Sequence, residues 1–255
     1  MKVIFVGNGS SVKDYKAGSV IDEFDIVIRF NRGFLEGIDK YKEFVGSKTD
    51  IVVVHPGFIY PWGEGSSIDS SIKEWKWEEK IKHVNMKVML SIGLRPENFV
   101  SKSDGIYDTM KRTGLSDSDF CYAYDFFRCA ESFKYNKYFK DKWDIISIDA
   151  PRNLKNIVDF KDTWPSTGLC GIYYVADKLT TAAEAVNGSA VKFYSYGFDG
   201  ADKKYKYYHY FNHTDKRTTE FHWRPDRKDH SLDAERECLD ILKEQFNIKE
   251  LKDEL

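Results

Sequence analysis

The stretch Val3-Ile4-Phe5-Val6-Gly7-Asn8-Gly9-Ser10-Ser11 decides the fold class of this chain. Its apolar run, followed at once by glycines and an asparagine, is typical of a buried strand that ends in a tight turn. A second apolar run, Ile26-Val27-Ile28, leads into Arg29-Phe30-Asn31, and residues 12–24 between the runs are long enough for a crossover helix. This order predicts an α/β fold in which helices flank a mostly parallel central sheet. We expect residues 1–255 to form one Rossmann-like domain, a size that suits a single α/β enzyme.

The turn after the first strand is the first candidate binding site. In doubly wound folds, ligands bind at the carboxyl ends of the strands, and Gly7, Asn8 and Gly9 lie at one such end. Asn31 follows the second run directly, so we expect it to face the same crevice as Asn8. Each asparagine side chain carries an amide donor and a carbonyl acceptor, which suit a nucleotide phosphate or ribose.

The first fifty residues contain four short motifs in a fixed order. They are Val6-Gly7-Asn8-Gly9, Gly18-Ser19-Val20-Ile21-Asp22, Asp25-Ile26-Val27-Ile28-Arg29-Phe30-Asn31 and Val45-Gly46-Ser47-Lys48-Thr49. Together they resemble the large sialylmotif of the eukaryotic-type sialyltransferases, glycosyltransferase family 29. A lone Gly-x-Gly would be weak, whereas the ordered set is specific.

Three later segments resemble the remaining motifs of that family, in the expected order. They are Pro165-Ser166-Thr167-Gly168 with Tyr196-Gly197-Phe198, then Tyr208-His209-Tyr210-Phe211, then His230-Ser231-Leu232-Asp233-Ala234-Glu235. A Ser-Thr-Gly turn at a helix N-terminus offers hydroxyl and backbone N–H groups to an anion, although a plain helix cap is its commoner use. The segment around residues 232–246 is predicted to be helical, and residues 56–160 carry no matching motif.

The resemblance implies the GT-A-like variant of the fold and an activity. A sialic acid or Kdo would pass from its CMP-activated donor to a glycan hydroxyl with inversion. His230 matches the base that takes the acceptor proton, and His209 matches the residue that assists the departing phosphate. Glu235 would orient the last motif. The implied donor-binding residues are Asn8, Asn31, Ser166, Thr167, Gly168, Gly197 and Phe198. His55, His213 and His222 remain rival histidines.

No metal or other cofactor is expected, because a monophosphate can leave with help from histidine and hydroxyl groups alone. Asp117-Ser118-Asp119 has the Asp-x-Asp pattern of metal-dependent transferases, but it lies in a polar, turn-like stretch where capping is the simpler use. Two alternatives stay open. One is a metal-dependent transferase that uses another nucleotide sugar, and the other is a catalytically silent nucleotide- or glycan-binding relative.

Composition and the chain ends bear on partners and location. Net charge is −2, from 39 basic and 41 acidic side chains, which does not indicate nucleic-acid binding. The first strand opens at residue 1 and there is no long apolar run, so we expect no signal peptide, no transmembrane segment and a cytoplasmic protein of bacterial or viral origin. The acceptor would then be an oligosaccharide, capsule or lipopolysaccharide. Lys252-Asp253-Glu254-Leu255 spells a retrieval signal, which we interpret as the charged end of a terminal helix or a coincidence.

Several weaker predictions complete the analysis. Cys170 and Cys238 lie in apolar contexts and are expected to be buried free thiols. Strands are expected over residues 87–92, 142–148 and 191–198, a helix over residues 68–84, and helical structure at the end of residues 96–113. The aromatic run at residues 121–127 is expected to fill the core, with the lining of a pocket as the alternative.

Overall fold

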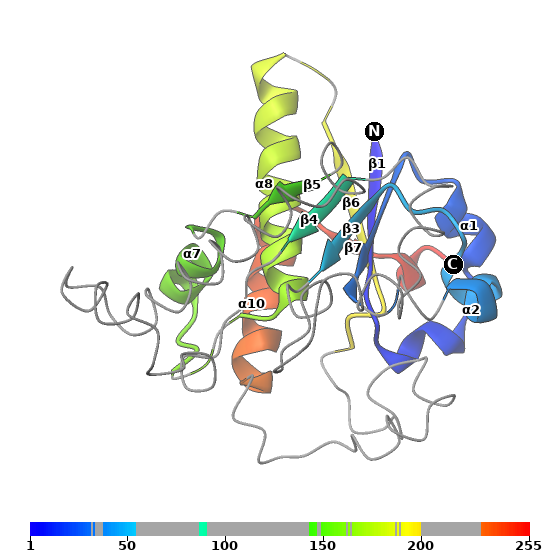
Figure 1. Cartoon of the computed structure of the whole chain (residues 1–255), viewed down its shortest axis with the longest axis horizontal. Helices are drawn as coiled ribbons and strands as arrows, with labels where there is room; N and C mark the ends of the chain where they lie inside the picture. The colour runs from blue at the N-terminus through cyan, green and yellow to red at the C-terminus, as the bar shows by residue number, and fades with distance from the viewer. Residues whose placement is uncertain are drawn as a thin grey trace, which may run out of the picture.

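In the computed structural model, the described part of the chain contains a central sheet of seven parallel strands (Figure 1). The structure describes residues 1–31, 33, 38–54, 87–90, 143–146, 149–161, 163, 165–186, 188, 190–199 and 231–255, with the backbone alone at 87–90 and 143–145. The strands are β1 (Lys2–Val6), β2 (Ile26–Phe30), β3 (Ile51–Val54), β4 (Lys87–Leu90), β5 (Trp143–Ile145), β6 (Lys192–Tyr196) and β7 (Lys249–Glu250). The expected strands near residues 87, 142 and 191 are thus confirmed, whereas the expected elements over 68–84, 96–113 and 121–127 lie outside the described residues.

The order of the strands locates the place where ligands bind in such sheets. The order is β5-β4-β3-β2-β1-β6-β7, and every pair is parallel. The chain adds β2 to β5 on one side of β1, then returns to place β6 and β7 on the other side. The sheet therefore has its topological switch point between β1 and β6, where crossover connections diverge and leave a crevice at the carboxyl ends. In register, Val6 lies opposite Tyr196, so both strands end together.

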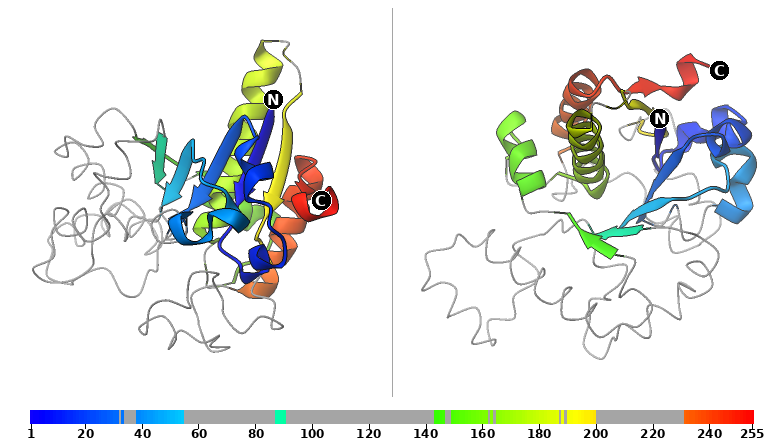
Figure 2. Two further views of the ribbon diagram at one scale, coloured as in Figure 1. Left: turned by 90° about the vertical axis from the view of Figure 1, so that its right-hand side faces the viewer. Right: turned by 90° about the horizontal axis from the view of Figure 1, so that it is seen from above.

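Helices cover both faces of the sheet (Figure 2). One face carries α7 (Asp149–Ile157), α8 (Thr167–Ala185) and α10 (Leu232–Gln245), and the other carries η1 (Ser10–Asp14), α1 (Gly18–Asp22) and α2 (Ile38–Val45). Side chains alternate along β1, because Val3 and Phe5 face the first layer and Ile4 and Val6 face the second. The strands are apolar on both faces because both faces are covered. Of the described helices, none is both long and apolar enough to span a bilayer.

The segment 12–24 differs from the single helix that its length predicts. It forms two short helices, η1 and α1, separated by an extended Tyr15. The hydroxyl of Tyr196 donates to the carbonyl oxygens of Val12 and Tyr15, at 2.8 and 3.1 Å. Those two carbonyls bond to β6 instead of to a continuing helix, so a contact distant in sequence ends the first helix.

The C-terminus ends in a short helix, as predicted, but this helix is not a continuation of α10. Helix α10 stops at Gln245, Asn247 adopts a left-handed φ of 49°, and the chain then adds β7 to the sheet edge before the short helix η4 (Leu251–Asp253). Leu251 is buried in the core on the side of η1. Glu250 makes ion pairs with Lys243 of α10 and with Lys252. The C-terminal residues therefore form a short edge strand and a short helix, which the ion pair with Lys243 ties to α10 and the burial of Leu251 ties to the core.

A buried arginine connects two parts of the sequence that resemble the large motif. The Arg29 side chain is 1% exposed on the α1 and α2 face. Its Nη2 donates to the carbonyl of Val45 at 2.7 Å and of Lys48 at 2.9 Å, and its Nε donates to Thr49 Oγ1 at 2.9 Å. A planar guanidinium can bond all these acceptors at once because its donors point in fixed, divergent directions. Arg29 thus fixes the segment that leads into β3.

Asp22 holds the same segment from the other side. Its carboxylate accepts the backbone N–H of Ser47 and of Lys48, both at 2.8 Å from Oδ1, and the Ser47 hydroxyl at 2.9 Å. Gly46 adopts a left-handed φ of 72°, and a Cβ there would lie 2.4 Å from Asp22 Oδ1. Glycine is required at this turn for both reasons. We call Asp22, Arg29 and residues 45–49 the clasp, and its role is structural.

Candidate active site

The glycine-rich turn after β1 packs directly on the turn after β6. The N–H of Gly7 donates to the carbonyl of Tyr196 at 2.7 Å, and that of Gly9 donates to the carbonyl of Gly197 at 2.9 Å. A Cβ on Gly7 would lie 2.4 Å from the oxygen of Gly197, so a larger residue does not fit. The two turns therefore close the switch point between β1 and β6 as a single backbone unit.

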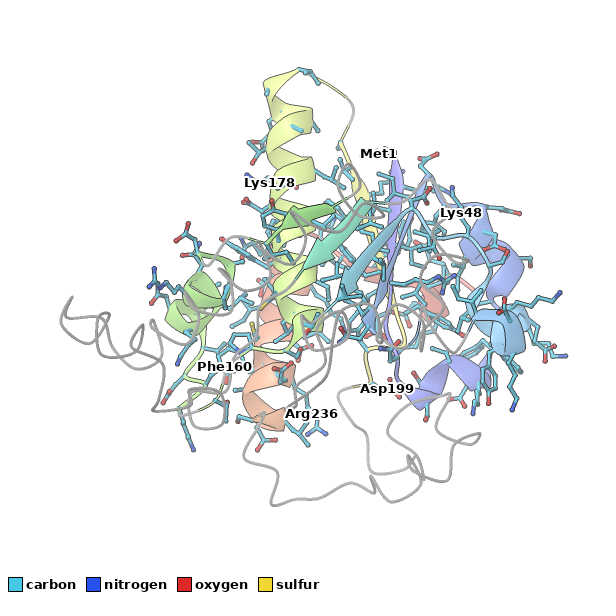
Figure 3. All side chains as sticks on the ribbon, in the orientation of Figure 1. Met1, Lys48, Phe160, Lys178, Asp199 and Arg236 are labelled. Atoms are coloured by element: carbon cyan, nitrogen blue, oxygen red, sulfur yellow. The ribbon has the colours of Figure 1, made fainter. Side chains whose placement is uncertain are left out.

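Asp199 completes this unit, and the sequence analysis does not identify it. Its Oδ2 accepts the N–H of Ser11 at 2.9 Å, across the switch point. A Cβ on Gly9 would lie 1.3 Å from Asp199 Oδ1, so the carboxylate occupies the space that any other residue at position 9 needs. The glycine at position 9 is the sequence signal for this close approach. Asp199 lies at the lower end of the sheet in Figure 3, opposite the end that carries Met1.

Asn8 and Asn31 both lie at the carboxyl ends of their strands, as predicted, and each also has a structural part in the turn there. Asn8 Nδ2 donates to the carbonyl of Phe30 at 3.0 Å, so part of its amide ties β1 to β2. A Cβ on Gly33 would lie 1.9 Å from Asn8 Oδ1, which places the amide oxygen against the backbone after Asn31. Asn31 itself has a left-handed φ of 44°, a conformation that asparagine tolerates better than most residues. Both asparagines therefore shape the turn, whatever they contribute to a ligand.

Phe198 joins the turn after β6 to the other expected donor-binding residues. Its ring meets Phe30 edge to face, with centroids 5.4 Å apart. A Cβ on Gly168 would lie 3.3 Å from Phe198 Cε1, and one on Gly7 would lie 3.0 Å from Cδ2. Phe198 therefore packs against the ends of β1 and β2 and against the start of α8. Three segments that are far apart in sequence meet around this one ring.

The Ser-Thr-Gly turn is the N-terminus of α8, as predicted. Ser166 is the N-cap residue, and its Oγ accepts the N–H of Leu169 at 3.3 Å. Thr167 is the first helical residue and is 8% exposed. The positive end of a 19-residue helix thus points to the switch-point edge, where it favours a negatively charged group.

Glu235 links this turn to α10. The N–H of Ser166 donates to Glu235 Oε1 at 2.6 Å, across 69 residues of sequence. Ser231 is the N-cap residue of α10, and its Oγ accepts the N–H of Ala234 at 3.4 Å. The expectation that Glu235 orients the last motif thus gains a geometric basis: the carboxylate holds the N-terminus of α10 against that of α8.

Two of the expected site residues cannot be placed. His209 and His230 lie outside the described residues, as do the rival histidines His55, His213 and His222 and the pair Asp117 and Asp119. Ser231, the residue that follows His230 in the chain, is described. It is the N-cap residue of α10, and Glu235 in the first turn of that helix bonds to the start of α8. The other expected site residues, from Gly7 to Phe198, gather at one edge of the sheet.

A polar cavity of about 480 Å³ opens beside β6 on the side of α10. Of the expected donor-binding residues, Gly197 and Phe198 line it, whereas Asn8, Asn31 and the Ser-Thr-Gly turn do not. The rest of its wall carries both charges, with Asp14, Asp199, Arg236 and Lys243 among the lining residues. Figure 3 shows Arg236 and Asp199 toward the same end of the molecule. The cavity thus adjoins the switch point rather than filling it.

The two described cysteines are buried free thiols, as expected. Burial, and after it the nearby carboxylates of Glu235 and Glu237, raises the pKa of Cys238 to about 12. Its thiolate is therefore scarce at neutral pH, and Cys238 packs as a small apolar side chain in the core with Cys170.

Comparison with known proteins agrees with the motifs. Residues 2–96 match the model of glycosyltransferase family 29 (sialyltransferase). Over 80 residues the chain is 42% identical to a rat CMP-N-acetylneuraminate-beta-1,4-galactoside alpha-2,3-sialyltransferase and 34% identical to the human protein of that name. The rat alignment spans 31% of this chain but only 21% of the rat protein, and the human alignment spans 31% and 20%.

The fold also matches that of a solved structure. A crystal structure of a mammalian sialyltransferase superimposes with a TM-score of 0.53 at 18% identity, over 98% of this chain and 68% of that one. At this identity the likeness concerns the fold, and it extends the match beyond the residues that the family model covers. Residues 2–96 thus match glycosyltransferase family 29, the sialyltransferases, and the chain shares its fold with a solved mammalian sialyltransferase.

Proposed function

We propose that this protein is an inverting glycosyltransferase that moves a sialic acid from its CMP-activated donor to a glycan hydroxyl without a metal ion. His230 acts as the base toward the acceptor, and His209 assists the phosphate leaving group. CMP-Kdo is the second donor to be tested. Because the relatives named above act on beta-1,4-galactosides, lactose is the first acceptor to try.

The single observation that carries the proposal is the hydrogen bond from Ser166 N–H to Glu235 Oε1. It joins the Ser-Thr-Gly turn to the segment that contains His230-x4-Glu235, although the two lie far apart in sequence. The chemistry requires such a junction, since a donor held at the helix N-terminus and a base acting on the acceptor must meet at one carbon. The remaining donor-side residues reach the same edge through Phe198.

The proposed division of labour follows from the charges that develop during transfer. The acceptor hydroxyl loses a proton as its oxygen attacks the anomeric carbon, and an imidazole that titrates near neutral pH suits that task. The bond to CMP breaks on the opposite side, and negative charge gathers on the phosphate. Hydroxyls of Ser166 and Thr167, the helix N-terminus and His209 would stabilise that charge.

Nucleotide preference tests the donor assignment. Calorimetry should give tighter binding of CMP than of UMP or AMP, and replacing Asn31 should weaken CMP binding by about 1–3 kcal/mol. Because Asn31 has a positive φ, Asn31→Ala adds backbone strain to the loss of the amide, so Asn31→Gly is the cleaner variant. Equal affinity for the three nucleotides would refute a CMP donor.

Two histidine variants test the catalytic assignment. With CMP-N-acetylneuraminate and lactose, His230→Ala should lower turnover by about 10²–10⁴-fold while the affinity for CMP stays within twofold of wild type. His209→Ala should lower both turnover and CMP affinity. A donor whose leaving group needs no assistance should recover more turnover in His209→Ala than in His230→Ala. His213→Ala and His222→Ala are the controls, and a dead control beside an active His230→Ala would show that the base is misassigned.

A further inference from the structure

The first turn of α10 contains no side chain at its third position that could accept the N–H of the N-cap residue, as the capping box does. In a capping box, the third helical residue is an acid that accepts the N–H of the N-cap residue. In α10 the N-cap residue is Ser231 and the third residue is Ala234, whose side chain is in the core and 5% exposed. A glutamate cannot occupy that buried position without a large desolvation cost, so the acceptor for Ser231 N–H must come from elsewhere.

Thr163 supplies that acceptor. The N–H of Ser231 donates to Thr163 Oγ1 at 3.3 Å, and the Thr163 hydroxyl donates in turn to the carbonyl of Phe160 at 2.7 Å. One hydroxyl has a single proton and two lone pairs, so it satisfies both partners without conflict. The threonine therefore bridges the loop before α8 and the start of α10.

The loop that carries Thr163 is built as a fixed turn. The N–H of Thr163 also donates to the carbonyl of Phe160, at 3.0 Å, and the ring of Phe160 is fully buried in the core. Lys161 adopts a left-handed φ of 53°, and its N–H donates to Asp159 Oδ1 at 2.8 Å. These contacts determine where the hydroxyl of Thr163 lies before α10 meets it.

The start of α8 shows the same arrangement in the opposite direction. Its third helical residue is Leu169, which is 3% exposed, and the N–H of its N-cap residue Ser166 donates to Glu235 of α10. Each helix thus receives its missing cap acceptor from the segment of the other: Thr163 caps α10 and Glu235 caps α8. This reciprocal capping sets the relative position of the two helix N-termini.

We propose that Thr163 is a positioning residue for the sugar-transfer reaction, acting through the backbone of Ser231, the residue next in the chain to the proposed base. The inference rests on the proposed function, because it gives Thr163 a role only if His230 is the base. Thr163 contacts no reacting atom. It fixes the N-terminus of α10 against the Ser-Thr-Gly turn, and a displacement of about 1 Å between reacting groups can cost as much as 10²-fold in rate.

The test compares Thr163→Val, Thr163→Ser and Tyr173→Phe with wild type in CMP-N-acetylneuraminate and lactose kinetics and in CMP calorimetry. Valine keeps the shape but removes the hydroxyl, so kcat should fall about tenfold or more while KM for the donor and Kd for CMP stay within twofold. Serine restores the hydroxyl and should restore kcat to within twofold. Tyr173→Phe removes a different hydroxyl, which accepts from Asn153 Nδ2 at 3.0 Å between α8 and α7, and should leave kcat unchanged.

The outcomes separate this inference from the proposed function. If His230→Ala abolishes turnover but Thr163→Val keeps a kcat within twofold of wild type, the inference is wrong and the function stands. If His230→Ala keeps its turnover, the assignment of His230 as the base is wrong, and the role inferred for Thr163 falls with it. Should Thr163→Val not fold, Thr163→Ala and Thr163→Ser, which differ only by the hydroxyl, give the same comparison. Hydrogen exchange at the Ala234 amide must also be faster in the variant without the hydroxyl, since a loosened cap exposes it.

Discussion

Glu235→Ala should destabilise the protein because one carboxylate serves two helices. The charge-assisted bond from Ser166 N–H at 2.6 Å contributes about 1.5–3 kcal/mol. The same charge lies in the first turn of α10 and at the N-terminus of α8, and each helix dipole adds about 0.3–1 kcal/mol. Because the site is only half-buried, we expect a loss of about 2–4 kcal/mol in the free energy of unfolding. Glu235→Gln should lose about half of that, since its amide oxygen can still accept.

Urea unfolding followed by tryptophan fluorescence measures this loss, as a shift in midpoint at constant slope. Glu237→Ala is the matched control, because Glu237 lies two residues further along the same helix and is exposed. CMP calorimetry on the same variants reports whether the Ser-Thr-Gly turn moves with α10. If Glu235→Ala is as stable as Glu237→Ala, the bond between α8 and α10 does not hold the two helix starts together, and the observation that carries the proposed function loses its weight.

Three further predictions concern metal, pH and thiol chemistry. Transfer should survive excess EDTA, and a loss of activity that Mn²⁺ restores would favour the metal-dependent alternative. Burial, with Lys40 nearby, lowers the pKa of Lys13 to about 8, so the unfolded chain binds more protons above that pH. Stability should rise between pH 8 and 9.5 in wild type and stay flat in Lys13→Met, as measured by urea midpoints. Cys238 should resist alkylation in the native protein at pH 7.5 and react on unfolding, as peptide mapping by mass spectrometry would show; rapid native labelling would contradict its burial.

The sheet could be predicted from the sequence because its signals are local. Short runs rich in valine and isoleucine mark β1, β2 and β3, and the structure confirms these strands. The interruption between η1 and α1 could not be predicted, because it depends on the hydroxyl of Tyr196, about 180 residues away in the chain. Local pattern shows that an element exists, whereas a distant hydrogen bond determines where it ends.

The residues of the candidate site could likewise be predicted from local sequence, whereas the contacts between them could not. Ser166 was predictable as a helix cap and Glu235 as part of a motif, but their bond depends on the packing of α8 against α10. Asn8 was predicted to face a ligand, and the structure adds a bond to Phe30 that no spacing rule indicates. The only sequence signal for Asp199 is Gly9, because the carboxylate of Asp199 occupies the space that a side chain at position 9 would need. A glycine that no turn type explains can therefore indicate that a side chain distant in sequence packs against it.

The first fifty residues carry two separate physical tasks. Asp22, Arg29 and residues 45–49 form the clasp, in which every described contact is internal to the scaffold. Gly7, Asn8, Gly9 and Asn31 instead stand at the carboxyl edge beside β6 and α8. Substitutions in the clasp should therefore lower stability and leave the nucleotide preference unchanged, whereas substitutions at the carboxyl edge should change binding. The match to the family model cannot separate these tasks because it covers both, and the contacts of each residue can.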